Sequence, residues 1–388
     1  KKKRDTCLAV FGVARVDEPR PVQGAVTMAR AKRRAQPAER IYELDWLMLA
    51  VVCLCCVGLT MAVSVQGAKH GAEFAVREQG AKLIAGLVAL VTMSLFPLGL
   101  LRRYAKHLFA VGIVLVLATL FFVDERKGAT RWLRFGGTSF QPVEFARIAL
   151  IVLTATVIAK VGARRAEFRA GFIPVLTPAV ILAAALALQP DLGNALLTMT
   201  LACAMAVSCG VALRWFFLAA LPLIPALVVA VRGYQLDRIH GFLGDEPPLQ
   251  VQRSLTAIGS GGFAGTGVGN GWMKMGFVPE AQNDFVFAII GEELGLVGAI
   301  FVLGLFALIG YVGFRLVLTL RDPFHRYVVF GCTFAICMQA LVNLLVTTGM
   351  APAKGIDLPL VSSGGTNLVA TLAMVGLIGN AARADSAV

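Results

Sequence analysis

Charged residues are scarce in this chain of 388 residues. Asp, Glu, Lys and Arg together make up 15% of it, whereas an ordinary soluble domain contains about 25%. Hydrophobic residues make up 57%, and the mean hydropathy is +0.76. So few charges cannot cover the surface of a soluble protein of this length. The composition therefore excludes an ordinary soluble enzyme and indicates a membrane protein.

The chain also lacks the usual signatures of metal and nucleotide sites. Its four histidines are scattered, and none has the spacing to cysteine that zinc ligands show. Seven of the eight cysteines fall inside apolar runs, where thiols act as small packing groups. The Gly-x-Gly-x-Gly stretch at 265–269 has no P-loop Lys-Ser/Thr after it. The sequence thus predicts no disulfide framework, no structural metal and no ATP hydrolysis.

Apolar runs long enough to cross a bilayer as helices recur along the chain. They predict an all-α polytopic membrane protein with about ten spans. These lie at residues 45–65, 80–101, 105–123, 142–160, 172–188, 191–210, 213–231, 285–317, 326–348 and 362–381. The segments 172–188 and 191–210 are the weakest, because only a short Gln-Pro-Asp-Leu-Gly turn separates them.

Basic residues in short loops favour the cytoplasmic side of a membrane. Clusters at 102–106, 160–169 and 315–326 alternate along the chain, which predicts that both termini are cytoplasmic and that 232–284 forms a large external loop. Four cations break this bias and are expected outside: Arg126, Lys127, Arg131 and Arg134.

The two ends of the chain are interpreted as tails around a membrane domain at 45–383. Residues 1–44 contain two basic runs and little apolar periodicity, which predicts a disordered cytoplasmic tail drawn to anionic lipid. Nucleic-acid binding is the alternative for this tail, and we expect none. Met28 could be the true start, and 384–388 are expected to form a short cytoplasmic tail.

Four acids lie close together where the external loop enters the eighth predicted span: Glu280, Asp284, Glu292 and Glu293. Carboxylates at a membrane edge are costly to keep and therefore indicate a functional site. Asp284 sits where a helix should begin, so an ordinary helix N-cap is the competing interpretation.

Further polar motifs are predicted on the same side. Glu144 and Arg147 are three residues apart at the start of a helix and can pair on one face. Asp191 is expected to cap the helix that follows it. Lys274 lies in a glycine-rich stretch that is either a linker or a loop able to cradle anions. Residues 348–365 are rich in turn residues and suggest a cavity-lining segment.

Together these motifs resemble the shape, elongation, division and sporulation (SEDS) family of peptidoglycan glycosyltransferases, formed by FtsW, RodA and SpoVE. The resemblance covers about 45–383 and is carried by eight motifs, namely 131–132, 141–144, 190–193, 267–270, Lys274, 279–288, 291–295 and 358–365. Pro279–Ala281 and Lys354 are more similar to the division branch, FtsW, than to the elongation branch. Arg147 and Ser363 depart from the family pattern, which usually has Lys and Tyr there.

The resemblance implies septal polymerisation of lipid II into β-1,4 glycan with inversion, and release of undecaprenyl pyrophosphate. It implies that Asp284 is the essential catalytic residue, and the acceptor hydroxyl, which must lose its proton, makes Asp284 the candidate general base. The residues expected to bind substrate are Arg131, Glu144, Arg147, Arg238, Lys274, Glu280, Lys354 and Ser362. No cofactor is certain, and a divalent cation could assist.

The same resemblance implies an active site on the external face of the bacterial inner membrane. The expected partners are a class B penicillin-binding protein, other membrane proteins of the division machinery and membrane lipid. Three alternatives stay open at this point: a lipid II flippase, a lateral-wall polymerase and a non-catalytic scaffold.

Overall fold

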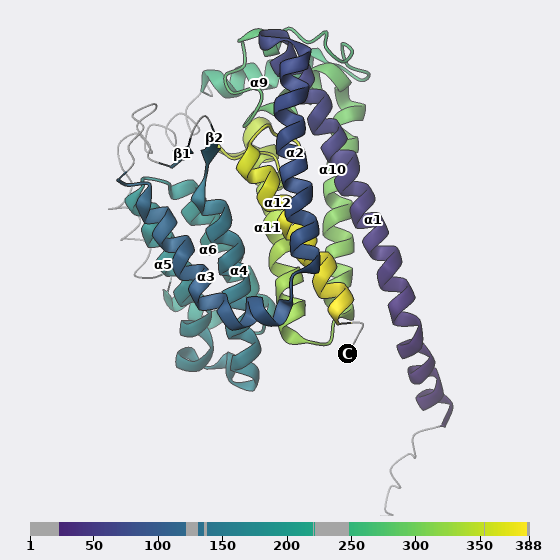
Figure 1. Ribbon diagram of the computed structural model, residues 1–388, viewed down its shortest axis with the longest axis vertical. Coiled ribbons are helices and arrows are strands. Elements are labelled where there is room, and N and C mark those ends of the chain that lie inside the picture. Colours follow the sequence, from purple (N-terminus) through teal and green to yellow (C-terminus); the bar gives the residue numbers. More distant parts are fainter. Residues whose placement is uncertain are drawn as a thin grey trace, which may run out of the picture.

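The structure, a computed structural model, describes residues 23–121, 131–135, 138–219, 221, 248–352 and 354–385. Over these ranges it is a bundle of helices with one short β-hairpin (Figure 1). The bounds of the main elements are α1 Gln23–His70, α2 Ala72–Leu95, α3 Leu98–Ala118, β1 Leu133–Phe135, β2 Thr138–Phe140, α4 Pro142–Val161, α5 Ile173–Leu188, α6 Leu192–Ser208, α9 Leu249–Ser260, α10 Val286–Thr319, α11 Pro323–Thr347 and α12 Gly365–Ala384.

The described residues contain fewer membrane spans than the ten predicted. Six segments are long and apolar enough to cross a bilayer, and the pair α2 and α3 would make a seventh if it forms one bent span. Helix α6 is shorter than a span, at 17 residues, and most of the predicted span 213–231 lies outside the described residues. The all-helical polytopic class is confirmed, whereas the number ten is not reached in this part of the chain.

A proline explains how two predicted spans merge into one bent pair. Helices α2 and α3 meet at an angle of 113°, and Pro97 occupies the N-cap of α3. A residue before proline is disfavoured in the helical region, and Phe96 accordingly has an extended conformation, with φ −67° and ψ 133°. The break therefore falls at Phe96 rather than near residue 103, where the sequence alone placed it.

Helix α1 also begins earlier than the predicted membrane domain. It starts at Gln23, although only Tyr42–His70 within it qualifies as a span. The helix therefore takes in half of the segment that the sequence assigned to a basic tail.

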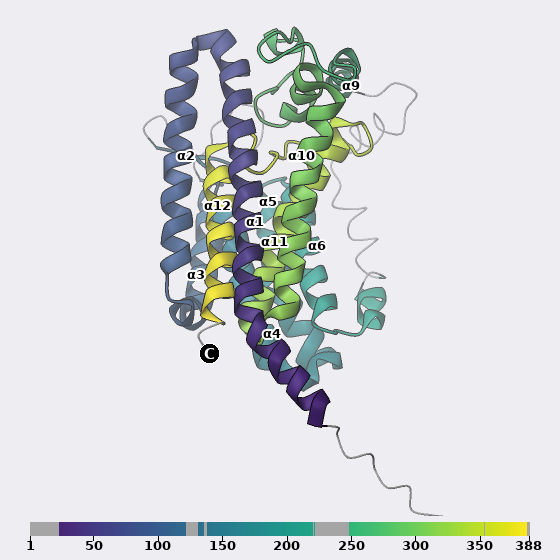
Figure 2. The same cartoon turned by 90° about the vertical axis from the view of Figure 1, so that its right-hand side faces the viewer.

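The centre of the bundle is formed by α4 and α11, while α2 and α12 pack side by side along their lengths (Figure 2). Glycine allows this close approach, because a Cβ atom at Gly376 would collide with the carbonyl oxygen of Leu90. Small residues that let backbones meet are the usual means of packing helices in membranes.

One end of the bundle carries the α1–α2 turn, α9, the start of α10 and the α11–α12 segment, residues 348–364 (Figure 1). We call this the site end. The chain terminus after α12 lies at the opposite end (Figure 1), together with the α10–α11 turn and its Arg321, whose amide donates to Asp385 at 3.1 Å. This separation agrees with the predicted alternation of basic loops.

Candidate active site at one end of the bundle

The predicted Glu144–Arg147 pair forms and is almost fully buried. The Nη1 atom of Arg147 donates to Glu144 Oε2 at 2.9 Å, and the side chains are 2% and 5% exposed. Arg147 also donates to Gln339 of α11 and to Asn194 of α6, both at 2.8 Å. The i, i+3 spacing predicted the pair, whereas the two amide partners come from helices distant in sequence.

The network continues from Asn194 to the turn before α6. Asp191 caps this helix by accepting from the backbone N–H of Asn194, and its other oxygen accepts from the Asn194 side chain at 2.8 Å. Arg131, which precedes the β-hairpin, lies 3.5 Å from Asp191 and donates to the carbonyl of Pro190 at 3.1 Å. The predicted cap is confirmed, and Asp191 also anchors a cation of the site.

Asp284 lies in the turn before α10 and is half-buried. The N-cap of α10 is the following residue, Phe285, and its side chain makes no capping bond. Asn343 of α11 donates both to the backbone carbonyl of Asp284 at 2.8 Å and to that of Ile356 at 2.7 Å. One buried amide therefore fixes the backbone of Asp284 against the α11–α12 segment, and Asp284 does not occupy the cap position.

Ser362 completes the junction between these two segments. Its hydroxyl donates to the carbonyl of Asn283 at 2.6 Å and accepts from the N–H of Leu358 at 2.8 Å. Gly355 lies close beside the carboxylate, because a Cβ atom there would be only 3.1 Å from Asp284 Oδ2. The neighbouring Lys354 reaches α6, where its Cδ atom lies 3.5 Å from the Cβ position of Gly193.

Asp357 is a functional candidate that the sequence analysis missed. It is partly buried in the α11–α12 segment, and its carbonyl accepts from Gln339 at 3.1 Å. Burial, the largest cause, acts together with the negative charges of Asp284 and Glu144 to raise the pKa of Asp357 to about 8. The signal was present in the sequence: Asp357 is the only acid in a segment already suspected of lining a cavity.

Lys82 of α2 is the cation that acts against this shift of the Asp357 pKa. Its ammonium donates to Glu78 at 2.6 Å and to the carbonyl of Ser363 at 2.9 Å. Lys82 thereby ties α2 to the start of α12, a contact that no motif in the sequence indicated.

Lys274 belongs to a second polar cluster, in which the glycine loop, residues 261–276, is tied to α10. Its ammonium donates to Glu293 at 2.7 Å and to Ser64 of α1 at 2.8 Å. Glu293 also accepts from the N–H of Gly269 at 3.0 Å, and Glu292 accepts from the N–H of Trp272 at 2.7 Å. Both acids thus hold the loop in place, which favours the binding-loop interpretation over a free linker.

A kink in α10 makes room for the loop. Gly295 has φ +64° within the helix, and a Cβ atom there would collide with the backbone of Gly265. The N–H of Leu296 donates to the carbonyl of Gly262 at 3.0 Å. This left-handed backbone conformation favours glycine, since a residue with a side chain would be strained in it.

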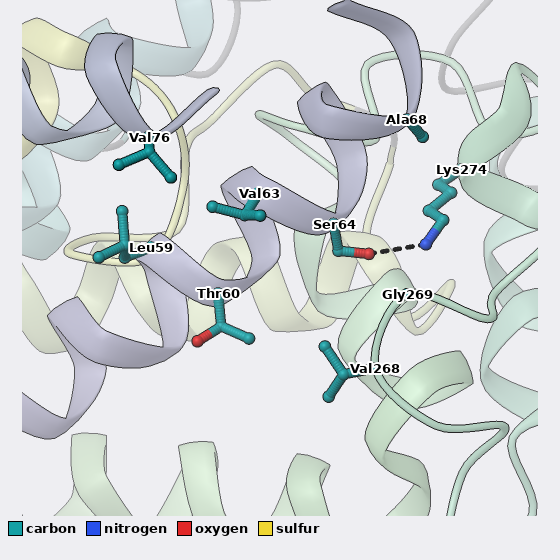
Figure 3. A pocket seen from close by; sticks show the side chains of 9 residues that line it. All are labelled: Leu59, Thr60, Val63, Ser64, Ala68, Val76, Val268, Gly269 and Lys274. Carbon is teal, nitrogen blue, oxygen red and sulfur yellow. Dashed lines mark hydrogen bonds between the residues drawn. The ribbon is translucent and has the colours of Figure 1, made fainter. Parts of the chain in front are cut away.

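An apolar cavity of about 560 Å³ lies between α1, the start of α2 and the glycine loop. Its polar floor is the hydrogen bond between Lys274 and Ser64 (Figure 3). The residues around it are Leu59, Thr60, Val63, Ser64, Ala68, Val76, Val268, Gly269 and Lys274. The cavity therefore offers an apolar wall at the site end of the bundle.

The structure thus brings most of the predicted site residues together. Lys354 and Ser362 belong to the α11–α12 segment, and Asp284, Glu144, Arg147 and Arg131 lie around it. Lys274 lies in the second cluster, and Glu280 is exposed, with φ +52° and a hydrogen bond of 3.2 Å from Asn283. Arg238 lies outside the described residues.

A family model described as a cell cycle protein, and named for FtsW, RodA and SpoVE, matches residues 45–387. The chain belongs to the FtsW/RodA/SpoVE family. A relative from Trichlorobacter lovleyi, named probable peptidoglycan glycosyltransferase FtsW, is 37% identical over 88% of this chain and 93% of its own length. One from Geobacter metallireducens with the same name is 36% identical over 87% of this chain and 94% of its own.

Two solved structures share the fold. A chain from a peptidoglycan synthase complex, whose structure is described as the structural coordination of polymerization and crosslinking, superposes with a TM-score of 0.73. It is 27% identical and covers 87% of this chain and 97% of its own length. The rod shape determining protein RodA of Thermus thermophilus superposes with a TM-score of 0.67 at 25% identity, and covers 87% of this chain and 96% of its own.

Proposed function

We propose that this member of the FtsW/RodA/SpoVE family is a septal peptidoglycan glycosyltransferase. It polymerises lipid II into β-1,4 glycan strands and releases undecaprenyl pyrophosphate. The observation that carries the proposal is the position of Asp284, a half-buried carboxylate whose backbone is fixed by Asn343 beside the Arg147 network. The names of the FtsW relatives point to the same activity.

In this mechanism Asp284 acts as the general base. It accepts the proton of the acceptor sugar hydroxyl, whose oxygen attacks C1 of the donor sugar. The bond from C1 to the pyrophosphate oxygen breaks, its electron pair leaves with the pyrophosphate, and the anomeric centre inverts. Pyrophosphate is a good leaving group, so one carboxylate suffices, whereas cleavage of a glycoside uses two.

Cations are needed where negative charge develops on the leaving group. Arg131 is 27% exposed and Lys354 is partly exposed, so these two are the better candidates for direct contact with the pyrophosphate. Arg147 and Lys274 are buried against Glu144 and Glu293. We therefore assign them to holding the site together, with Lys274 at the floor of the apolar cavity.

The apolar cavity beside α1 is our candidate entrance for the undecaprenyl chain. Helix α1 connects the cavity with the site, because the backbone of Leu360 and Val361 packs on Gly58 and the next residue, Leu59, lines the cavity. We expect Val63→Trp to raise KM for long-chain lipid II about tenfold and to leave a short-chain analogue unaffected. Val114→Trp, on an exposed face of α3, is the control. Equal effects of Val63→Trp on both substrates would refute this entrance.

A lipid II flippase is the alternative to a polymerase. A flippase would place its charges near the bilayer midplane and would show internal repeats, whereas the charges here gather at the site end.

The related chain from a peptidoglycan synthase complex supports a class B penicillin-binding protein as the partner here. We further propose that both termini are cytoplasmic and that the site end faces outward.

The deciding experiment compares Asp284→Asn with the unaltered protein in glycan-strand formation from purified lipid II, with and without the partner. Positioned proton transfer contributes about 10²–10⁴-fold, so the variant should lose at least that much activity while still binding lipid II. Glu73→Gln, in the exposed first turn of α2, is the matched control. An Asn variant with comparable activity would remove Asp284 from the mechanism. Lipid II transport in liposomes by an otherwise inactive variant would favour the flippase.

A further inference from the structure

Asp357 adds a second carboxyl group to the site, and the proposed function gives it no role. We propose that Asp357 contacts the substrate in its protonated form, and that its carboxylic acid O–H donates a hydrogen bond to the anionic diphosphate of the donor lipid beside Asp284. The inference rests on the proposed function, since it requires a diphosphate substrate at this site.

Three acids act on Asp357 from the elements packed around it. They are Asp284 before α10, Glu144 at the start of α4 and Glu280 in the preceding turn. The opposing cation is Lys82 of α2, which is already paired with Glu78.

The charge of Glu144 is matched by Arg147 at 2.9 Å, and the amide of Gln339 joins that pair to the backbone of Asp357. Lys354 lies three residues before Asp357 and reaches toward α6. If all these acids were ionised, several carboxylates would lie close to the dianionic diphosphate and repel it.

The carboxyl group of Asp357 is held in one place. Its backbone carbonyl accepts from Gln339, the preceding carbonyl of Ile356 accepts from Asn343, and its Oδ2 atom fills the space where a Cβ atom of Gly364 would lie. The same Asn343 fixes Asp284. The backbone that carries each of the two carboxyl groups is thus fixed by helix α11, and a proton on Asp357 would leave Asp284 as the ionised base.

A neutral acid next to an ionised one is the usual way to obtain a donor and a base from two carboxyl groups. Protonation removes one negative charge from the diphosphate site and supplies a donor. No extra reactant is needed, because the proton stays on Asp357 while Asp284 takes the proton of the acceptor hydroxyl. The pKa of about 8 for Asp357 means that the donor is present at neutral pH and is lost as the pH rises through 8.

The test is the pH dependence of kcat/KM for lipid II in four proteins: unaltered, Asp357→Asn, Asp357→Ala and Asp284→Asn. The unaltered protein should lose activity above about pH 8. Asp357→Asn keeps an N–H donor that cannot titrate, so it should stay active at pH 7 and lose this alkaline decline. Asp357→Ala removes the donor, and a hydrogen bond to a charged group is worth about 1.5–3 kcal/mol, so kcat/KM should fall about tenfold or more.

The pH dependence of protein stability, measured without substrate, distinguishes the loss of a protonated Asp357 from a folding defect. An acid with a raised pKa stays protonated in the native state while the unfolded chain ionises. The stability of the unaltered protein should therefore decrease as pH rises from about 4 to 8. Asp357→Asn should lack this dependence of stability on pH. The infrared band of a protonated carboxylic acid should be present at pH 7 in the unaltered protein and absent from Asp357→Asn.

Activity of Asp357→Ala equal to that of the unaltered protein would overturn the inference, as would an Asp357→Asn variant that keeps the alkaline decline. An Asp357→Asn variant as inactive as Asp284→Asn would mean that Asp357 works ionised, which also overturns it. Failure of the proposed function is a separate outcome, namely full activity of Asp284→Asn.

Discussion

The buried pair of Glu144 and Arg147 gives the sharpest test of the energetics of the site. Arg147→Met keeps much of the side-chain volume but leaves the Glu144 carboxylate, 5% exposed, without its guanidinium. Removing one partner of a buried pair typically costs about 3–5 kcal/mol, because the remaining charge is left uncompensated. We expect a loss of this size in the free energy of unfolding.

The pair should be strongly coupled. Glu144→Gln on its own leaves Arg147 bonded to Gln339 and Asn194. The double variant Arg147→Met/Glu144→Gln removes both charges and should therefore cost clearly less than the sum of the single variants. Exchanging the two residues should restore the protein level better than either neutralisation, although activity need not return.

Reversible unfolding in mixed detergent micelles, analysed as a double-mutant cycle, measures this coupling. Arg102→Met is the matched control, because Arg102 lies 3.9 Å from Asp322 and both side chains are 40% exposed, and exposed pairs contribute about 0–1 kcal/mol. The reasoning is refuted if Arg147→Met costs no more than Arg102→Met, or if the cycle is additive within about 0.5 kcal/mol.

Two further predictions concern the supports of the site. Asn343→Ala removes the donor to the carbonyl of Asp284 and should lower kcat about tenfold with unchanged lipid II binding; a change in KM alone would contradict this. Gly261→Ala places a Cβ atom against the carbonyl of Gly291 and should destabilise the protein by about 1–3 kcal/mol in thermal unfolding. Gly259→Ala, where the Cβ atom meets open space, should be near neutral, and equal melting temperatures for the two variants would contradict the packing.

Features that depend on nearest neighbours along the chain were accessible from the sequence. The long apolar runs predicted the membrane class, since a bilayer demands helices of about 20 apolar residues. The spacing of Glu144 and Arg147 predicted their pair, and the turn before α6 predicted the cap by Asp191, because both interactions lie within one helical turn.

The predicted boundary between two membrane spans was wrong for a local reason. The predicted break between the second and third spans lay beside the basic residues near 103, whereas the geometry before Pro97 ended α2 earlier and set the 113° bend. Hydropathy averages over a window, so it is insensitive to a single proline inside a continuous apolar run.

Tertiary structure decided which polar groups meet. The sequence placed Lys274 in a glycine-rich stretch, and only the structure shows that its partner is Glu293 of the kinked helix α10. Asn343 and Gln339 carry no motif, but as neighbours on one face of α11 they join Asp284, Asp357 and the Arg147 network. In a membrane the pairing of such groups depends on which helices approach one another, and that information is not contained in any single helix.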